Sequence, residues 1–419
     1  MHTIPRSFFL VVLLIARCAL AEDWPCFRGP TRQGVSSEKS LPLHWSSSQN
    51  VSWKSEIPGS GWSSPIVWGE RVFLTTATQE GASCHVLCID RRTGKITWDR
   101  EVLRQVPKQK EAKNSHATPT PVTDGRRVYA VFSDGSIVSL AVDGSTVWTN
   151  RDFPHYSQHG LGTSPILFEN LLIMSRDGSS EGEDKKPGWQ KPWDQSFLIA
   201  LDRDTGAVRW KTYRGNSRIG HTTPIIADGS ANPLLISNAG DIIQGFNPRT
   251  GEKIWWANSE GEGVVPSPVV GAGLVFTASG FGKPTTRAVR LGGRGDVTAS
   301  HLAWEQTRAV SMIPSFVYWE GYLYTVTTNG IACCMIARTG DIVWQQRIGG
   351  NYSASPIYAD GHIYFLSEEG ETTVIEAGPR YKLVATNALD GMVQASMAVS
   401  AGQLFIRTAG HLYCIRNRD

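Results

Sequence analysis

The sequence of 419 residues is poor in cysteine, in net charge and in long apolar runs, and each shortage excludes a class of protein. Its seven cysteines include no CxxC pair, which excludes zinc ribbons and c-type haem attachment, and they are too sparse for a disulfide framework. The formal net charge is only +3, so nothing predicts a nucleic-acid or anionic-membrane partner. No segment has the length of a membrane helix, and no sustained 3.6-residue periodicity predicts helices.

The first 21 residues have the features of an export signal. Arg6 precedes an apolar stretch from Phe8 to Ala16, and Ala19-Leu20-Ala21 fits the small-x-small rule for cleavage. Cys18 follows an arginine rather than the small residue that a lipoprotein signal requires. We therefore expect residues 1–21 to be removed and the protein to be exported to the periplasm or beyond.

What the chain has in abundance is aromatic and turn-forming residues: 15 Trp, 42 Gly and 22 Pro. They are arranged in a repeat, small-x-polar-x-x-Thr-Gly-x-x-x-Trp, which predicts a strand, a glycine turn and a second strand that carries one large aromatic side chain. The clear copies are Cys88 to Trp98, Ala200 to Trp210, Gly245 to Trp255 and Cys334 to Trp344; looser copies deliver Trp148 and Trp304.

A second mark precedes each hairpin and opens a short apolar strand. It recurs every 41 to 59 residues, at Ser64-Pro65, Thr120-Pro121, Ser164-Pro165, Thr223-Pro224, Ser267-Pro268, Pro314, Ser355-Pro356 and Ser396-Met397. Four strands per unit at this period are typical of propeller blades. The sequence therefore predicts an all-β, eight-bladed propeller.

Two units depart from the repeat, and the departures predict how the ring closes. The last unit ends at the chain terminus with three strands, so we expect Val51–Ser55, which carries Trp53, to supply its fourth strand and remove the open edge. The seventh unit has no Trp at its expected place. The predicted organisation is a leader at 1–21, an N-terminal extension at 22–50 and the propeller at 51–419.

The Thr-Gly-x-x-x-Trp unit resembles the tryptophan-docking motif of the PQQ-type (pyrroloquinoline quinone) propeller family. Two groups carry that motif: PQQ-dependent alcohol and sugar dehydrogenases, and non-enzymatic relatives such as the BamB outer-membrane assembly lipoproteins. The resemblance extends from Val51 to Asp419, and the segment Asp23 to Gly34 resembles the opening of exported bacterial PQQ-like propeller proteins. The resemblance predicts the fold strongly. It does not select a function, because the same fold hosts both an enzyme and a scaffold.

The repeat register assigns structural roles to two sets of residues. One tryptophan per blade is expected to pack on an outer strand and to donate its indole N–H to backbone, a set that comprises Trp53, Trp98, Trp148, Trp210, Trp255, Trp304 and Trp344. The neighbours Cys333 and Cys334 resemble the adjacent cysteines that contact the quinone in PQQ dehydrogenases. Cys334, however, aligns with small residues in every copy, which favours packing over a cofactor-contacting disulfide.

Candidate ligand-binding residues lie in loops that enter the inner strands and in one insertion between middle strands of the third blade, since these segments should meet at one mouth of the channel. The candidates are His116, His159, His221, Trp62, Tyr352, Trp193 and Asp194. The insertion from Arg176 to Gln195, with Asp177 and further carboxylates, is expected to reach the same mouth. Such a cluster could bind a metal, a ligand or a partner, or could consist of unrelated polar residues on solvated loops.

Three functions fit the sequence. The first is a non-catalytic, monomeric, exported scaffold that binds a protein or a small molecule at its mouth. The second is a PQQ-dependent oxidoreductase with calcium, although no catalytic aspartate or calcium-ligand set can be carried over from that family. The third is a saccharide hydrolase or lyase at the channel mouth. No catalytic residue and no metal site is predicted, and PQQ and calcium find no support among the motifs.

Overall fold

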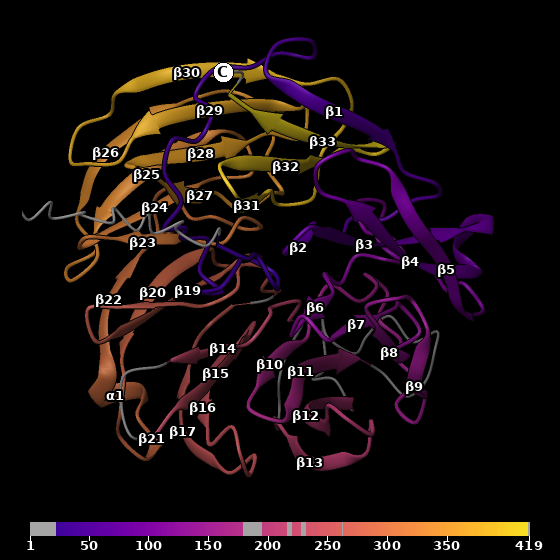
Figure 1. The fold of residues 1–419 in the computed structure, drawn as a ribbon. Coiled ribbons are helices and arrows are strands. Elements are labelled where there is room, and N and C mark those ends of the chain that lie inside the picture. Colours follow the sequence, from indigo (N-terminus) through magenta and orange to yellow (C-terminus); the bar gives the residue numbers. More distant parts are fainter. Residues whose placement is uncertain (1–21, 179–194, 216–219, 228–231, 262, 418–419) are drawn as a thin grey trace, which may run out of the picture.

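The computed structural model of the protein describes residues 22–178, 195–215, 220–227, 232–261 and 263–417. The predicted leader, Trp193 and Asp194 lie outside these ranges. The described residues form eight antiparallel sheets around one axis (Figure 1), which confirms the eight-bladed, all-β propeller. Within these ranges, helical structure is limited to a 3₁₀ turn (Gln79–Gly81) and α1 (Thr298–His301).

Each blade adds its strands from the axis outward. The strands of the first four blades are β2 (Ile66–Trp68), β3 (Arg71–Thr78), β4 (Ser83–Asp90) and β5 (Ile96–Arg104); β6 (Val122–Thr123), β7 (Arg127–Val131), β8 (Ile137–Ala141) and β9 (Thr146–Asn150); β10 (Ile166–Phe168), β11 (Leu171–Gly178), β12 (Gln195–Asp202) and β13 (Val208–Tyr213); and β14 (Ile225–Ala227), β15 (Leu234–Ala239), β16 (Ile242–Phe246) and β17 (Lys253–Asn258).

The second half of the ring follows the same order. Its strands are β18 (Val269–Gly271), β19 (Leu274–Ser279), β20 (Thr285–Arg290) and β22 (Leu302–Gln306); β23 (Val317–Trp319), β24 (Tyr322–Val326), β25 (Ile331–Ile336) and β26 (Ile342–Arg347); β27 (Ile357–Ala359), β28 (His362–Leu366), β29 (Glu371–Glu376) and β30 (Leu383–Ala388); and β31 (Ala398–Ser400), β32 (Gln403–Arg407) and β33 (His411–Arg416). The short β21 (Gly295–Asp296) adds a parallel fifth strand to blade 4.

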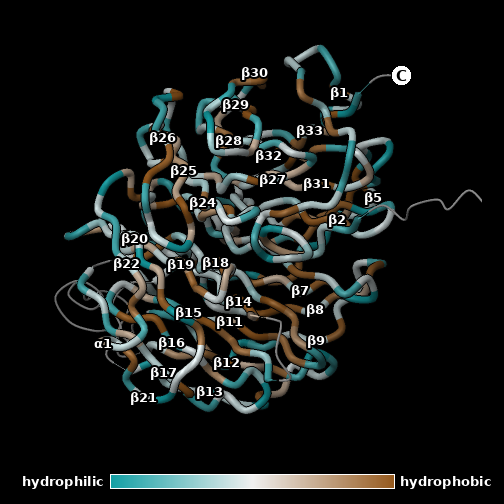
Figure 2. The backbone as a smooth tube through the Cα atoms, turned by 90° about the vertical axis from the view of Figure 1, so that its left-hand side faces the viewer, coloured by the Kyte–Doolittle hydropathy of each residue, from teal (hydrophilic) through white to brown (hydrophobic). Residues whose placement is uncertain are grey.

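The ring closes as the sequence predicts. The strand β1 (Val51–Glu56) pairs antiparallel with β33 and places Trp53 opposite Cys414. Blade 8 thus combines β1 with the three last strands of the described chain. It has four strands like the other blades, and β1 covers the edge of β33. The apolar side chains lie between neighbouring blades, and Figure 2 shows hydrophobic stretches along the strands and hydrophilic ones in the turns.

A ring of hydroxyl groups explains the mark that precedes each inner strand. The backbone N–H of each marked Ser or Thr donates to the side-chain hydroxyl of the corresponding residue in the next blade at 2.9 to 3.1 Å. The described bonds run from Ser64 to Thr120, Thr120 to Ser164, Ser164 to Thr223, Thr223 to Ser267, Ser267 to Ser315, Ser315 to Ser355 and Ser355 to Ser396. In blade 6 the mark is therefore Ser315-Phe316 rather than the predicted Pro314.

The tryptophan column joins neighbouring blades at their outer strands. Six of the seven tryptophans donate Nε1–H to a carbonyl of the next blade at 2.9 to 3.2 Å: Trp53 to Arg91, Trp98 to Val142, Trp148 to Arg203, Trp210 to Pro248, Trp304 to Ala337 and Trp344 to Gly378. The glycine of the Thr-Gly turn lets the ring approach, because a Cβ on Gly94 would come within 2.7 Å of Trp53.

Trp255 is the exception in this column. It is fully buried, and its Nε1 has no hydrogen-bond partner in the part of the chain that the structure describes. The added strand β21 pairs with Trp255, and the ring lies over Gly245 on the adjacent strand, where a Cβ would come within 2.3 Å of the indole nitrogen. Trp255 therefore packs within the fold without the interblade hydrogen bond that the repeat predicts.

Residues 22–50, here called the strap, cross the face of the ring at which the inner strands end. Figure 1 shows this indigo segment in front of the centre of the ring. Its backbone pairs with Val67 of blade 1 and Tyr358 of blade 7, and Pro25 accepts the N–H of Thr123 in blade 2. Further bonds join it to Leu167 of blade 3, Val270 of blade 5 and Phe316 of blade 6. The strap thus lies across the inner strands of six blades at this face.

The strap also fills the gap that blade 7 leaves in the tryptophan column. Ala385 stands opposite Val374, at the place that a tryptophan takes in the other blades. Trp45 of the strap packs into the same core cluster and stacks on Tyr364 with ring centroids 6.4 Å apart. Tyr364 corresponds in register to Phe73, which pairs with Trp98 in blade 1. A residue outside the repeat therefore replaces the missing one.

Candidate functional site

The face opposite the strap, here called the histidine face, is where the inner strands begin. The loops before β6, β10 and β14 carry His116, His155, His159 and His221 to this face. His159 and His221 lie together, with ring centroids 6.0 Å apart in an edge-on arrangement. The structure therefore brings two of the three predicted histidines into contact, because successive inner-strand loops are neighbours around the axis.

His116 makes other contacts. Its Nδ1 is 2.9 Å from the Ser133 hydroxyl, and its ring packs against Gly81 of blade 1. His116 and His155 both line a cavity of about 10 Å³, together with Lys108, Lys110 and Asp134. A cavity of this size holds about one water molecule.

Burial keeps these imidazoles neutral near pH 7. It lowers the pKa of His221 to about 3, an effect that the neighbouring His159 reinforces. Burial likewise lowers the pKa of His155 well below its usual range, and that of His116 and His159 to a lesser degree. Neutral imidazoles can ligate metals, yet the described residues contain no group of three His, Cys, Asp or Glu side chains that could hold one.

The two other described candidates lie in different surroundings: Trp62 beside the loop that carries His116, and Tyr352 in the core. Trp62 lies half-buried before β2, where its backbone N–H donates to the carbonyl of Ala117. Tyr352 is only 1% exposed and lies in the core shared by blades 6 and 7, where burial raises the pKa of its hydroxyl. Trp193 and Asp194 fall in the part of the chain that the structure leaves undescribed.

Asp177, at the start of the insertion, lies in the interior. Arg214 Nη1 donates to it at 2.8 Å and the Ser196 hydroxyl donates at 2.8 Å. Burial raises the pKa of Asp177 to about 6, while Arg214 and Ser196 act to lower it. This ion pair links blade 3 to the start of the loop that leads to blade 4.

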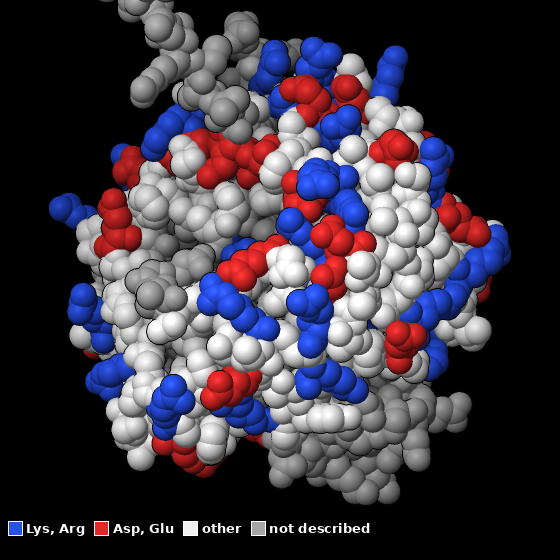
Figure 3. Space-filling view, turned by 60° about the horizontal axis from the view of Figure 1, so that its bottom comes forward, with Lys and Arg blue, Asp and Glu red and all other residues white. Residues whose placement is uncertain are grey.

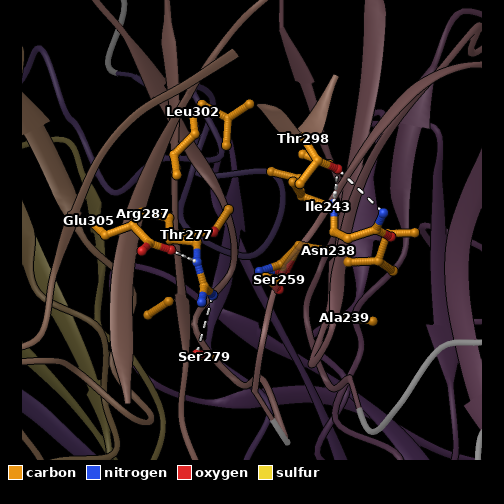
Figure 4. A pocket seen from close by; sticks show the side chains of 15 residues that line it. Asn238, Ala239, Ile243, Ser259, Thr277, Ser279, Arg287, Thr298, Leu302 and Glu305 are labelled. Atoms are coloured by element: carbon orange, nitrogen blue, oxygen red, sulfur yellow. Dashed lines mark hydrogen bonds and ion pairs between the residues drawn. The ribbon is translucent and has the colours of Figure 1, made fainter. Parts of the chain in front are cut away.

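A larger cavity, of about 40 Å³, lies between blades 4 and 5 on the same face (Figure 4). Its polar lining includes Asn238, Thr277, Arg287, Thr298 and Glu305. No motif pointed to these residues. The repeat register could have found them, because Arg287 stands at a position of the repeat where the other blades have uncharged residues.

The described residues do not fit PQQ, the quinone cofactor that the family resemblance implies. Cys333 and Cys334 are free and buried, and they point to opposite faces of β25. Cys333 packs with blade 5 and Cys334 with blade 7, so the two side chains serve as packing groups. Nor do the described carboxylates gather in a group that could hold calcium. We derive no chemical step through PQQ.

Sequence comparison supports the family assignment. A family model described as outer membrane protein assembly factor BamB matches residues 43–151 and 238–419. Polyvinylalcohol dehydrogenase of Pseudomonas sp. is 27% identical over 39% of this chain and 24% of its own length. BamB of Escherichia coli is 30% identical over 35% of this chain and 28% of its own length. The matched segments thus span about a quarter of either relative.

Structural comparison shows the same fold. BamB from Moraxella catarrhalis superposes with a TM-score of 0.63 at 12% identity, covering 88% of this chain and 97% of the other. A europium-containing methanol dehydrogenase superposes with a TM-score of 0.68 at 11% identity, covering 93% and 90%. With its repeats, its docking tryptophans and a family match over more than half its length, the chain belongs to the PQQ-like β-propeller family described as outer membrane protein assembly factor BamB.

Proposed function

We propose that the protein is an exported, non-catalytic scaffold that binds a protein partner through its histidine face. The observation that carries this proposal is the asymmetry of the two faces. The strap crosses the inner strands where they end, whereas the two cavities described above are lined by residues near the beginning of the inner strands. A binding surface on this molecule is therefore better placed on the histidine face.

The surface chemistry of the histidine face suits a protein partner. Val106 lies beside the smaller cavity and is 81% exposed, an apolar anchor of the kind that interfaces bury. The rim and strap side of the molecule, which Figure 3 shows, carry interspersed charges of both signs, so this side offers no single-sign field to select a polyanion. No helix among the described residues is long and apolar enough to cross a membrane.

Site-specific photocrosslinking in the exporting cell envelope tests this proposal. A photoreactive amino acid is placed at Val106 on the histidine face and, as the matched control, at the exposed Thr31 of the strap. We expect one discrete protein adduct from position 106 and none from position 31. Adducts from position 31 alone, or from neither position, would contradict the proposal. Sequencing the N-terminus of the same material tests export and the predicted cleavage after Ala21.

A quinoprotein oxidoreductase remains the second candidate, because polyvinylalcohol dehydrogenase and a methanol dehydrogenase are among the relatives. The packing roles of Cys333 and Cys334 speak against it. Mixing the purified protein with PQQ and calcium, and reading quinone absorbance and alcohol-dependent dye reduction, separates the two functions. Quinone binding with dye reduction would favour the enzyme over the scaffold.

A further inference from the structure

The cavity between blades 4 and 5 is built from two facing sets of cross-strand neighbours. Blade 4 contributes Asn238 and Ile243, and blade 5 contributes Thr277, Arg287 and Glu305, which stand opposite one another in register. Figure 4 shows Arg287 and Glu305 on one side of the cavity and Asn238 and Thr298 across from them. The cavity holds about 40 Å³, enough for about three water molecules or one small polar group.

The repeat makes Arg287 an anomaly. It directly precedes the small residue that faces the docking tryptophan, and it points into the interface between two blades. In the other seven blades this column holds Leu87, Val138, Ile199, Gln244, Cys333, Thr373 and Tyr413. An arginine that is 7% exposed in an otherwise uncharged packing column has a cost in stability, and such costs are typical of functional sites.

The polar groups of the cavity are incompletely paired. Arg287 donates Nε–H to Glu305 at 2.5 Å and Nη2–H to the Glu260 carbonyl at 3.1 Å, whereas Nη1 has only the Ser279 hydroxyl, at 3.5 Å. The side-chain Oδ1 of Asn238 is fully buried and has no hydrogen-bond partner among the described residues, and the residue is only 2% exposed. A buried carbonyl oxygen without a donor reduces stability until a partner satisfies it.

The paired charges define what the cavity would accept. Glu305 already balances Arg287, so an anionic ligand would compete with a carboxylate that is in place. What the cavity lacks is a donor for Asn238 Oδ1 and a second, closer acceptor for Arg287 Nη1, whose one acceptor among the described residues is the Ser279 hydroxyl at 3.5 Å. A carboxamide presents a donor and an acceptor side by side without net charge. The apolar wall, made of Ile242, Ile243, Val289 and Leu302, would contact the carbon atoms that such a group carries.

We propose that the cavity between blades 4 and 5 is a binding site for a neutral carboxamide group, held between Asn238 and Arg287. The group comes either from a small free amide or from the glutamine or asparagine side chain of a peptide. This site goes beyond the partner-binding function proposed above and does not depend on it.

Methyl NMR of the full exported chain tests the site, because four methyl-bearing side chains line it. Acetamide and the tripeptide Gly-Gln-Gly are titrated separately, with acetate as the matched anion. We expect saturable shifts at Ile242, Ile243, Val289 and Leu302 with acetamide and none with acetate. Stronger shifts with the tripeptide would identify a peptide as the source; shifts with acetamide alone would identify a free amide. Shifts with acetate alone would overturn the proposal, and so would the absence of shifts with all three probes.

Two variants connect the shifts to the named residues. Asn238→Leu keeps the volume and removes the amide, and we expect it to abolish the acetamide shifts and to leave the melting temperature unchanged or raised. Asn351→Ala changes an exposed residue on the same face outside the cavity and should leave the shifts intact. Shifts that persist in Asn238→Leu would overturn the assignment. If Asn238→Leu fails to fold, Arg287→Leu, which restores the uncharged column, gives the same test.

Discussion

A single tryptophan of the docking column combines two stabilising contacts. Trp210 is 9% exposed, donates Nε1–H to the Pro248 carbonyl at 3.1 Å and covers Gly251 of the next blade. We expect Trp210→Ala to lower the free energy of unfolding by about 3–5 kcal/mol, the usual cost of truncating a buried aromatic residue.

Urea unfolding followed by fluorescence measures that loss. The control is Tyr213→Ala on the same strand, where the side chain is 58% exposed and the change should stay below about 1 kcal/mol. Equal effects of the two substitutions would contradict the docking role of Trp210.

The buried histidines predict a pH dependence of stability. Burial lowers the pKa of His221 to about 3, compared with 6.5 in the unfolded chain. As the pH falls, the unfolded state therefore takes up a proton before the folded state does. The contribution of the neutral His221 to the free energy of unfolding is complete above pH 6.5. It is lost as the pH falls, at up to about 1.4 kcal/mol per pH unit. We expect His221→Asn to flatten the plot of unfolding free energy against pH between 6.5 and 4.

Asp177 acts in the opposite direction and supplies an internal check. Its pKa is raised from 3.8 to about 6, so the folded state retains the proton longer and this contribution to stability grows as the pH falls from 6 to 4. Asp177→Asn should therefore steepen the loss of stability below pH 6. The exposed His44→Asn serves as the control. A slope unaffected by His221→Asn would contradict the account.

At the scale of elements, the strap and blade 7 are coupled through one packing position. Trp45 stacks on Tyr364 beside Ala385, where the repeat calls for a tryptophan. We expect Trp45→Ala to destabilise the protein by about 3 kcal/mol and Ala385→Trp to destabilise it by overpacking, by about 1–3 kcal/mol.

The double variant Trp45→Ala/Ala385→Trp decides whether the two side chains share one place. If they do, the double variant should lose less free energy of unfolding than the two single variants lose together, with a coupling of about 1–3 kcal/mol in a double-mutant cycle. Additive losses would show that Trp45 packs independently of the blade 7 column.

At the scale of the whole molecule, the ring depends on β1 to complete blade 8. Deleting Val51–Glu56 would expose the long edge of β33, which pairs with β1 along its length. We expect the deletion variant to associate through that edge and to melt at a lower temperature. Light scattering after size-exclusion chromatography measures the mass, and a monomer with unchanged melting temperature would contradict the closure role.

The sequence predicted most of the fold because the fold is periodic. Thr-Gly turns, Ser/Thr-Pro marks and the tryptophan column each occur once per blade, so copies reinforce one another, and β1 closes blade 8 as predicted. The site was harder to predict. The register placed His159 and His221 in neighbouring loops, but Tyr352 lies in the core, since an aromatic residue near an inner strand can face either the channel or the next blade.

The sequence by itself thus determined the number of blades, their strand order and the packing role of Cys334, because a repeated pattern records the contacts that every blade makes. Only the tertiary structure decided what happens outside the repeat. It placed Trp45 in the gap of blade 7, laid the strap across one face and set Arg287 opposite the unpaired Oδ1 of Asn238. Those contacts join residues far apart in the chain, and no local periodicity encodes them.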